Sequence, residues 1–571
     1  MRILPLFSLV MLCFGSYCQN RLPTLITGKI LNPSSDSIAI GDTSLILSEK
    51  GEFVYSMRLV KRAYFDVKYN IHEISIFLAP KDSLEISFDA RQFDRSLKFT
   101  GNSAKVNYIL SGQKYTDLDV NNYFNNNWVK LFSKDETSFI KTIDSLKQLY
   151  LRPINAFEAR KEELNKSFVF DLKNEVNFGF DRLILSYLQQ HSIFTGRDTV
   201  LSKSTIDYLN AINLDDENLM GVKNYMRFGN EWLDWKIRQD FQRNETLRKM
   251  DNQWLNSAFV FIQDEFKDQA VLDFWLYHYL VSHINNQGVK NLEDMIQRFN
   301  EVAKNKEYKD AVNDLYSKAL EKNKDHIVKT YKNINGFTLN AHIFKPSNLK
   351  AGEKRPAMVY FHGGSWSEGK PEWHFGQSEF GFINIAVEYR TYGRHAALPF
   401  EEISDAKSFF RWLRTNANEL NIDPNKIVAS GNSAGGHLVL CAAMLDTLDE
   451  PGEELSMSSK PDLLILNSAV FDLSGWNWFD YLLKEKKEKI AISPVHQIKK
   501  GLPPMLIFHG TNDRAVPIET ARNFVEEMRK TGNKVEFYPI LNAPHELWFD
   551  PEYQKIEKGA KKDFLKKNKF L

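Results

Sequence analysis

The sequence predicts an α/β domain with a mostly parallel sheet and helices on both faces, preceded by a small β-sandwich and an all-helical domain. Three observations support this order. Residues 20–102 alternate apolar and polar positions, residues 103–325 carry helical spacing, and residues 326–571 place short apolar runs between helical patterns. A chain of 571 residues also exceeds what one core organises, so roughly three domains of ordinary size are expected.

Residues 1–19 have the outline of a secretory signal peptide. One cation, Arg2, precedes an apolar run, and smaller residues follow around Gly15 and Ser16. The run is too short to span a bilayer, so no integral membrane span is expected from it. We therefore predict a secreted or periplasmic protein, and attachment of a lipid to Cys18 stays open as an alternative.

Charge and cysteine content exclude several classes of partner and site. Lys and Arg number 74 against 73 for Asp and Glu, a balance that does not favour binding to nucleic acid. Cys13 and Cys18 lie in or beside the signal segment, which leaves Cys441 without a disulfide partner. Cys and His show no metal-ligand spacing, so we expect neither a metal site nor a cofactor.

The segment 20–102 is expected to form a small antiparallel sandwich. Gly, Asn, Asp and Ser separate its alternating runs, which cover residues 24–31, 44–47, 53–59, 64–69, 74–78 and 84–88. Two stretches, Phe77 to Leu84 and Phe99 to Asn102, resemble the β-rich domain of unknown function that precedes some periplasmic thioredoxin-like proteins. That resemblance implies no catalytic residues.

Residues 103–325 show apolar residues three and four positions apart, the spacing of amphipathic helices. His278 and His283 lie in this region, and we interpret them as packed or solvated helix residues rather than metal ligands. The segment suggests no chemistry of its own.

Residues 326–571 are expected to form the parallel sheet. Apolar runs without alternation indicate strands buried on both faces. The predicted strands are 357–361, 383–387, 426–430, 463–466, 505–508 and 535–538, and the clearest helices are 401–418 and 518–530.

The strongest motif is Gly431 to Gly436, which contains Ser433 in a Gly-x-Ser-x-Gly pattern. It follows a predicted strand and opens a helical run, so the serine would lie on a tight strand-to-helix turn with its hydroxyl exposed. The spacing predicts a nucleophile, because small residues beside such a serine relieve crowding. A turn used only for packing is the competing interpretation.

A nucleophilic serine needs an imidazole base and a carboxylate that orients it. Asp513 follows the strand 505–508, and His545 lies in the loop after the strand 535–538. Both would project from the carboxyl edge of the sheet, where Ser433 emerges. Asp472 is the rival acid, whereas His437 and His509 are expected to be structural.

Backbone amides should stabilise the negative charge that develops during acyl transfer. We predict the amide of Ala434, directly after the nucleophile, and those of Gly363, Gly364 and Ser365 after the strand 357–361. His362 would brace this loop. The same segment runs on to Gly369-Lys370, which looks like part of a phosphate-binding loop, but Pro371 replaces the expected Ser or Thr.

Taken in order, these motifs resemble the esterase families related to hormone-sensitive lipase, including secreted acetyl-xylan and feruloyl esterase-like enzymes. The resemblance covers about Val328 to Phe549 and rests on Asn335 to Pro346, His362 to Trp366, Val387 to Arg390, Gly431 to His437, Leu502 to Asp513, and Pro544 with His545. It implies an α/β-hydrolase fold, a Ser433, Asp513 and His545 triad, and hydrolysis of a small-molecule or glycan ester through an acyl-enzyme. Ser365 departs from the third glycine common in such loops.

Aromatic residues near the site are candidates for contact with substrate. We include Trp366 and, in the segment where such folds build a cap, Trp476 and Trp478. Ordinary packing of the cap is the alternative for Trp476 and Trp478. For the whole chain, a serine peptidase of the prolyl-oligopeptidase kind and a non-catalytic glycan-binding or scaffold protein stay open. Such peptidases often carry a β-propeller with periodic sheet repeats, and the helical middle of this sequence shows none. The intact order of Ser, Asp and His argues against the non-catalytic protein.

Overall fold

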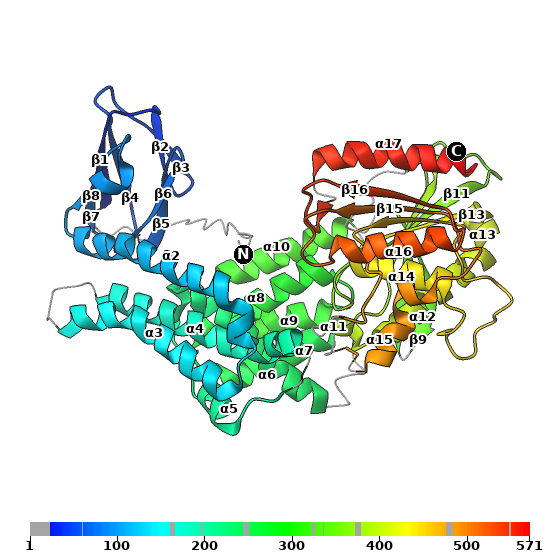
Figure 1. The fold of residues 1–571 in the computed structure, drawn as a ribbon, viewed down its shortest axis with the longest axis horizontal. Coiled ribbons are helices and arrows are strands. Elements are labelled where there is room, and N and C mark those ends of the chain that lie inside the picture. The colour runs from blue at the N-terminus through cyan, green and yellow to red at the C-terminus, as the bar shows by residue number, and fades with distance from the viewer. Residues whose placement is uncertain are drawn as a thin grey trace. The chain divides into compact units, whose positions relative to one another are not determined.

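The computed structural model of the protein describes residues 23–571 except 60, 160–165, 196, 198, 244–250, 323–325, 335, 372–378, 476–481, 484 and 548–549. The predicted signal peptide therefore lies outside the described residues, as does Cys18. The chain divides into two compact units, Met1–Trp232 and Leu233–Leu571, and Figure 1 colours them in chain order. The division falls inside the predicted helical segment, so helices belong to both units.

The first unit begins with the β-sandwich. One sheet has the order β4-β1-β7-β8 and the other β3-β2-β5-β6. The strands are β1 (Thr24–Leu31), β2 (Ser37–Ile40), β3 (Thr43–Ile46), β4 (Glu52–Met57), β5 (Ala63–Tyr69), β6 (His72–Leu78), β7 (Ser83–Asp89) and β8 (Lys98–Thr100). The expectation of a purely antiparallel sandwich is wrong in one place, because β1 and β7 run parallel. The chain passes through the second sheet before β7 joins the first, and this crossover aligns the two strands.

Helices complete the first unit. They are α1 (Phe93–Ser96), α2 (Ala104–Phe132), α3 (Glu136–Ala159), α4 (Lys166–Thr195), α5 (Lys203–Asn210), η1 (Glu217–Gly221) and α6 (Lys223–Arg243), whose last residues enter the second unit. The buried Asn107 side chain of α2 joins helix to sandwich: it accepts a hydrogen bond from the Phe77 amide at 2.7 Å and donates one to the Phe77 carbonyl at 3.0 Å.

Within the described part of the second unit, four further helices belong to the predicted helical segment, in addition to the end of α6. They are α7 (Gln253–Glu265), α8 (Gln269–Gln287), α9 (Glu293–Val302) and α10 (Lys306–Lys322). His278 and His283 lie on α8, and burial lowers the pKa of both imidazoles. This agrees with the interpretation of packed histidines.

An eight-stranded sheet forms the rest of the second unit, in the order β16-β15-β14-β13-β11-β12-β10-β9. Its strands are β9 (Ile327–Ile334), β10 (Phe337–Phe344), β11 (Arg355–Phe361), β12 (Ile383–Val387), β13 (Ile422–Asn432), β14 (Leu463–Asn467), β15 (Met505–Gly510) and β16 (Val535–Ile540). Strands β11 to β16 are parallel to one another, and β10 is antiparallel to β9 and β12. The predicted, mostly parallel sheet is confirmed.

Helices cover both faces of this sheet (Figure 1). The remaining helices are α11 (Tyr392–His395), α12 (Pro399–Thr415), α13 (Ala417–Leu420), α14 (Ser433–Met444), α15 (Lys486–Ile492), α16 (Ile518–Lys530) and α17 (Pro551–Lys567), with short turns η4 (Glu379–Gly381) and η6 (Pro494–Gln497). Alternate strand residues divide between two cores, one shared with α12, α14 and α16 and the other with α17. Every residue of β12 and β14 is buried, which explains their uninterrupted apolar sequences.

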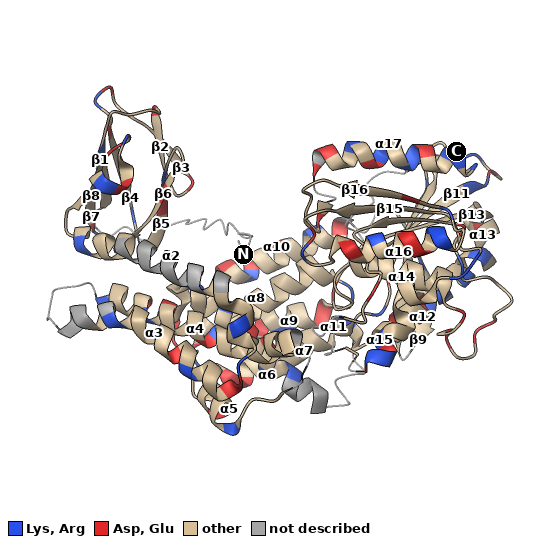
Figure 2. Cartoon of the chain, viewed as in Figure 1, with Lys and Arg blue, Asp and Glu red and all other residues tan. Residues whose placement is uncertain are grey.

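The near balance of charge in the sequence is visible along single helices. Figure 2 shows acidic and basic residues interspersed along α16 and α17. Among the described residues, no helix combines the length and the apolar character needed to cross a membrane.

Candidate active site

Ser433 lies at the turn between β13 and α14, as the motif predicts. It is the first residue of α14, directly after the last residue of β13, and its φ of 51° lies in the left-handed region. A non-glycine residue adopts such a backbone only where its surroundings impose it. Gly435 makes the turn possible, because a Cβ there would lie 2.1 Å from the carbonyl oxygen of Phe361.

The predicted acid and base meet in the structure. His545 Nδ1 lies 2.8 Å from Asp513 Oδ2, a hydrogen bond that fixes the orientation of the imidazole ring. The Asp513 side chain is 0 % exposed and that of His545 is 13 % exposed. The rival acid, Asp472, lies elsewhere, with Oδ1 3.7 Å from His496 Nε2.

The loop around Asp513 holds its carboxylate in the ionised form. His509 Nε2 lies 3.2 Å from Asp513 Oδ2, and the amides of Ala515 and Val516 donate to Oδ1 at 3.0 and 2.8 Å. Burial alone would raise the pKa of Asp513, but the hydrogen bonds from His509 and His545 outweigh it and set the pKa below its ordinary value. His509 is thus a structural partner of the acid, as predicted.

Sheet register places Ser433 and His545 at the same edge. Asn432, the residue before the nucleophile, pairs with Asn467 at the end of β14. The next residue of that strand end, Ser468, donates its hydroxyl to the carbonyl of His545 at 2.9 Å. The His545 backbone is therefore anchored one strand away from the turn that carries Ser433, at the carboxyl ends of the parallel strands.

The loop after β11 requires one correction to the predicted oxyanion site. The Gly363 amide donates to Asn432 Oδ1 at 2.9 Å, so this amide is used within the protein and is removed from the predicted oxyanion site. The amides of Gly364, Ser365 and Ala434 stay as the predicted donors to the oxyanion. Gly363 has a packing role instead, because a Cβ there would approach Asn432 to 3.1 Å and the Cβ of Ser433 to 3.3 Å.

Side chains that the sequence analysis did not assign to the site hold this loop in place. Asn432 Oδ1 also accepts the Tyr360 hydroxyl at 2.5 Å, and the Tyr389 hydroxyl donates to the His362 carbonyl at 2.7 Å. The His362 and Tyr389 rings stack with centroids 4.3 Å apart, which agrees with a bracing role for His362. Both missed residues stood inside the quoted motifs, Asn432 before the serine and Tyr389 in Val-Glu-Tyr-Arg, but nothing local in the sequence revealed their partners.

The substrate contacts predicted for tryptophan need one correction. Trp366 is 1 % exposed, and its indole donates to His437 Nδ1 at 3.3 Å. It therefore supports the loop from the core, because its ring has almost no surface for a ligand. His437 also binds the carbonyl of Ile492 at 2.8 Å, which confirms its structural role. Trp476 and Trp478 lie outside the described residues.

Lys370, the lysine of the segment that looks like part of a phosphate-binding loop, has a hydrogen-bond partner within the protein. Lys370 Nζ donates to the carbonyl of Ile284 at the end of α8, at 3.2 Å. The amine that a nucleotide would need is thus directed to the protein backbone. Among the described residues, no group of three His, Cys, Asp or Glu side chains is arranged to hold a metal ion.

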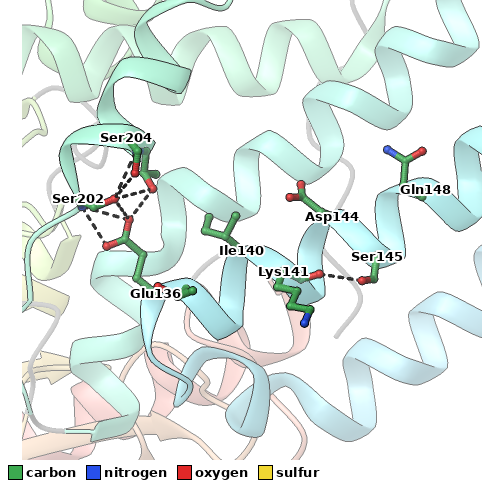
Figure 3. Close-up of a pocket in the computed structure, with 10 residues that line it drawn as sticks. Glu136, Ile140, Lys141, Asp144, Ser145, Gln148, Ser202 and Ser204 are labelled. Carbon is green, nitrogen blue, oxygen red and sulfur yellow. Dashed lines mark hydrogen bonds between the residues drawn. The ribbon is translucent and has the colours of Figure 1, made fainter.

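A hollow in the first unit has different chemistry. Figure 3 shows it between α3 and the start of α5, with Glu136 directed toward Ser202. Glu136 accepts hydrogen bonds from the Ser202 amide at 2.9 Å, the Ser202 hydroxyl at 2.8 Å and the Thr205 hydroxyl at 2.5 Å. Since Ser202 is the N-cap of α5, this carboxylate stabilises a helix end.

Comparison with known proteins is consistent with the geometry of the second unit. Residues 342–528 match the family described as BD-FAE. Esterase LipC of Mycobacterium tuberculosis is 26% identical over 217 residues, which are 33% of this chain and 52% of LipC. Isoprenylcysteine alpha-carbonyl methylesterase ICME of Arabidopsis thaliana is 25% identical over 232 residues, 36% of this chain and 52% of that protein. The chain thus spans about half the length of these curated relatives.

Solved structures with similarity to the chain include esterase 2 of Thermogutta terrifontis, phosphoramylated by tabun. It is 39% identical, with 43% of this chain and 96% of that chain covered and a TM-score of 0.41.

Proposed function

From the premise that residues 342–528 form a BD-FAE domain with an α/β-hydrolase fold, we propose that the protein is a serine carboxylic ester hydrolase. The hydrogen bond between His545 and Asp513, at the edge where the Ser433 turn emerges, is the observation that supports this most. The named relatives of the same domain are esterases. A peptidase or a non-catalytic scaffold has no comparable support.

The proposed reaction is acyl transfer in two steps. The Ser433 hydroxyl attacks the ester carbonyl while His545 Nε2 takes its proton, and the imidazolium then gives that proton to the leaving alcohol. Water, deprotonated by the same imidazole, attacks the acyl-enzyme, and the imidazolium returns the proton to the Ser433 oxygen as the acid leaves. Ionised Asp513 stabilises the imidazolium, and the amides of Gly364, Ser365 and Ala434 bind the oxyanion of each tetrahedral intermediate.

The proposed substrates are acetyl or feruloyl esters on carbohydrates. The supporting argument is the resemblance of the ordered motifs to secreted acetyl-xylan and feruloyl esterase-like enzymes. Export agrees with this substrate class, since the charge and apolar pattern of residues 1–19 is that of a signal peptide. Mass analysis of the mature protein from its native host should find this segment removed, either through about residue 19 or, in the lipid-anchored alternative, through Tyr17 so that a lipid-modified Cys18 becomes the first residue. A retained initiating segment would contradict export.

Replacement of the nucleophile tests the proposal. We expect Ser433→Ala to lower turnover of p-nitrophenyl acetate by roughly a thousandfold or more, because no other group replaces the attacking oxygen. Ser456→Ala is the matched control, since Ser456 is an exposed serine in the loop after α14. Circular dichroism should show both variants folded.

The substrate class is tested separately with acetylated xylan, feruloylated arabinose and a prolyl peptide. Release of acetate or ferulate by the wild type, but not by Ser433→Ala, is expected. Wild-type turnover by Ser433→Ala would contradict the catalytic proposal, whereas cleavage of the peptide alone would replace the esterase by a peptidase.

A further inference from the structure

The end of helix α8 contacts the segment that follows the oxyanion loop. The last turn of this helix and the loop are joined by three hydrogen bonds: Gln287 Nε2 to the Ser367 carbonyl at 3.2 Å, the Gly369 amide to the Asn286 carbonyl at 3.0 Å, and Lys370 Nζ to the Ile284 carbonyl at 3.2 Å. Each bond involves a backbone group of the loop or of the helix end. The helix thus constrains the path of residues 367–370 as well as their side chains.

These residues contact the carbonyl oxygens of Gly363 and Gly364, which belong to the peptide groups that carry the predicted oxyanion amides. Gly369 has a φ of 122°, and a Cβ there would lie 2.0 Å from His362 Nδ1 and 2.6 Å from the Gly363 carbonyl. The amides of Ser367 and Glu368 both donate to the Gly364 carbonyl, at 2.9 and 3.0 Å. A displacement of residues 367–370 would therefore rotate the peptide that joins Gly364 to Ser365.

A second attachment reaches the same loop through α11. The amides of Tyr392 and Gly393 donate to the carbonyls of Trp366 and Ser367, each at 2.9 Å. The fit is tight, because a Cβ on Gly393 would lie 2.5 Å from the Ser367 carbonyl and 2.8 Å from Gln287 Nε2. The loop, the end of α8 and α11 therefore come together at Ser367, Gln287 and Gly393.

The start of α7 holds α11 in place (Figure 1). Arg394 of α11 forms hydrogen bonds to both Asp251 oxygens, at 3.1 and 3.2 Å, and to Asn252 Oδ1 at 3.3 Å. The Arg394 side chain is 8 % exposed and that of Asp251 is 16 % exposed, so the pair is shielded from water. Removing one partner of such a pair leaves a buried charge unpaired and is costly.

We infer that residues 251–291, which precede the hydrolase fold in the chain, are a positioning part of the active site. Their role is to fix the loop 362–370 so that the Gly364 and Ser365 amides point at the developing oxyanion. Gln287 is the positioning residue with the most direct contact. The inference rests on the proposed function, and it adds that the hydrolase fold alone does not complete its oxyanion site.

The test compares two Gln→Met substitutions in the full-length protein, and each keeps the length of the side chain. Gln287→Met removes the donor to Ser367 and keeps a side chain of similar size. Gln297→Met is the control, because Gln297 is an exposed residue of α9 whose side-chain amide donates to Glu301 Oε1 at 2.9 Å, one turn along the same helix. Titration with a fluorophosphonate counts the competent sites, so that kcat is expressed per active site.

For Gln287→Met we expect kcat for p-nitrophenyl acetate to fall roughly tenfold while KM changes less than about twofold. The inhibition constant of a trifluoromethyl ketone should rise by the same factor as kcat falls, since its tetrahedral adduct places an oxyanion in the same site. Lys370→Met, which removes another bond of the same attachment, should shift both quantities in the same direction. Gln297→Met should leave them unchanged.

The outcomes separate this inference from the function on which it rests. If Ser433→Ala is inactive but both Gln287→Met and Lys370→Met keep the wild-type kcat and inhibition constant, the positioning role is wrong and the esterase stands. A loss confined to the number of titratable sites would also overturn it, because it would show a folding role only. If Ser433→Ala retains activity, the proposed function itself fails.

Discussion

Asp513 in the second unit and Glu136 in the first are carboxylates with similar surroundings and different roles. Each accepts several hydrogen bonds: Asp513 from His545 and from the amides of Ala515 and Val516, and Glu136 from Ser202 and Thr205. In both, burial raises the pKa, and the hydrogen bonds outweigh burial and lower it. Both are therefore ionised near neutral pH.

The difference lies in what the carboxylate orients. Glu136 holds backbone and hydroxyl groups at the N-cap of α5 (Figure 3), and these groups do not act as bases. Asp513 orients the imidazole of His545, a side chain that can take and return a proton in acyl transfer. A well-satisfied carboxylate is thus insufficient evidence for a catalytic site. The identity of the donor and its place at the carboxyl edge of a parallel sheet decide the role.

The largest expected effect is on catalysis and separates the two carboxylates. Asp513→Asn should lower kcat/KM for p-nitrophenyl acetate by roughly 10³ to 10⁴ at neutral pH, because an amide can hold the imidazole in the wrong tautomer. Glu136→Gln should leave kcat/KM unchanged. Equal losses in the two variants, measured side by side, would remove the distinction between them.

A smaller effect concerns stability. Glu136→Ala deletes the acceptor of three hydrogen bonds at the start of α5, and we expect it to lower the free energy of unfolding by roughly 1 kcal/mol. Urea denaturation followed by far-ultraviolet circular dichroism measures this difference. No loss of stability would mean that solvent replaces the carboxylate at this cap.

The smallest effect is on the acid dependence of stability. The pKa of Asp513 is below its ordinary value of 3.8 in the folded protein, so the unfolded chain binds a proton that the folded protein does not. The stabilisation is present above about pH 4 and is lost as the pH falls toward the folded pKa. Urea midpoints measured between pH 5 and 3 should fall less steeply for Asp513→Asn than for the wild type. A steeper fall would reverse the assigned sign.

The sequence predicted best those features that depend on local pattern. Uninterrupted apolar runs located β11 to β16, and the glycines beside Ser433 located the strand-to-helix turn. Asp513 and His545 were predictable because strand ends of one parallel sheet share an edge. The antiparallel β9 and β10 at the start of the sheet were not singled out as strands, since their runs mix polar and apolar residues.

Features that depend on contacts between distant segments could not be predicted. The Gly363 amide is engaged by Asn432, and the Trp366 ring is buried beside His437; both partners lie about seventy positions away in the chain. The attachment of α8 to the oxyanion loop joins Gln287 to Ser367 across a similar separation. Apolar periodicity reports which face of a helix is buried, but it does not identify what covers that face.

Covalent labelling tests the central claim most directly. The full-length protein is treated with a fluorophosphonate, digested, and mapped by mass spectrometry, with Ser433→Ala and His545→Ala treated in parallel. The account predicts one adduct on Ser433 in the wild type, none in Ser433→Ala, and a labelling rate reduced roughly a hundredfold or more in His545→Ala, because the base no longer activates the hydroxyl. An adduct on another residue that accounts for the lost esterase activity, with Ser433 unmodified, would contradict it.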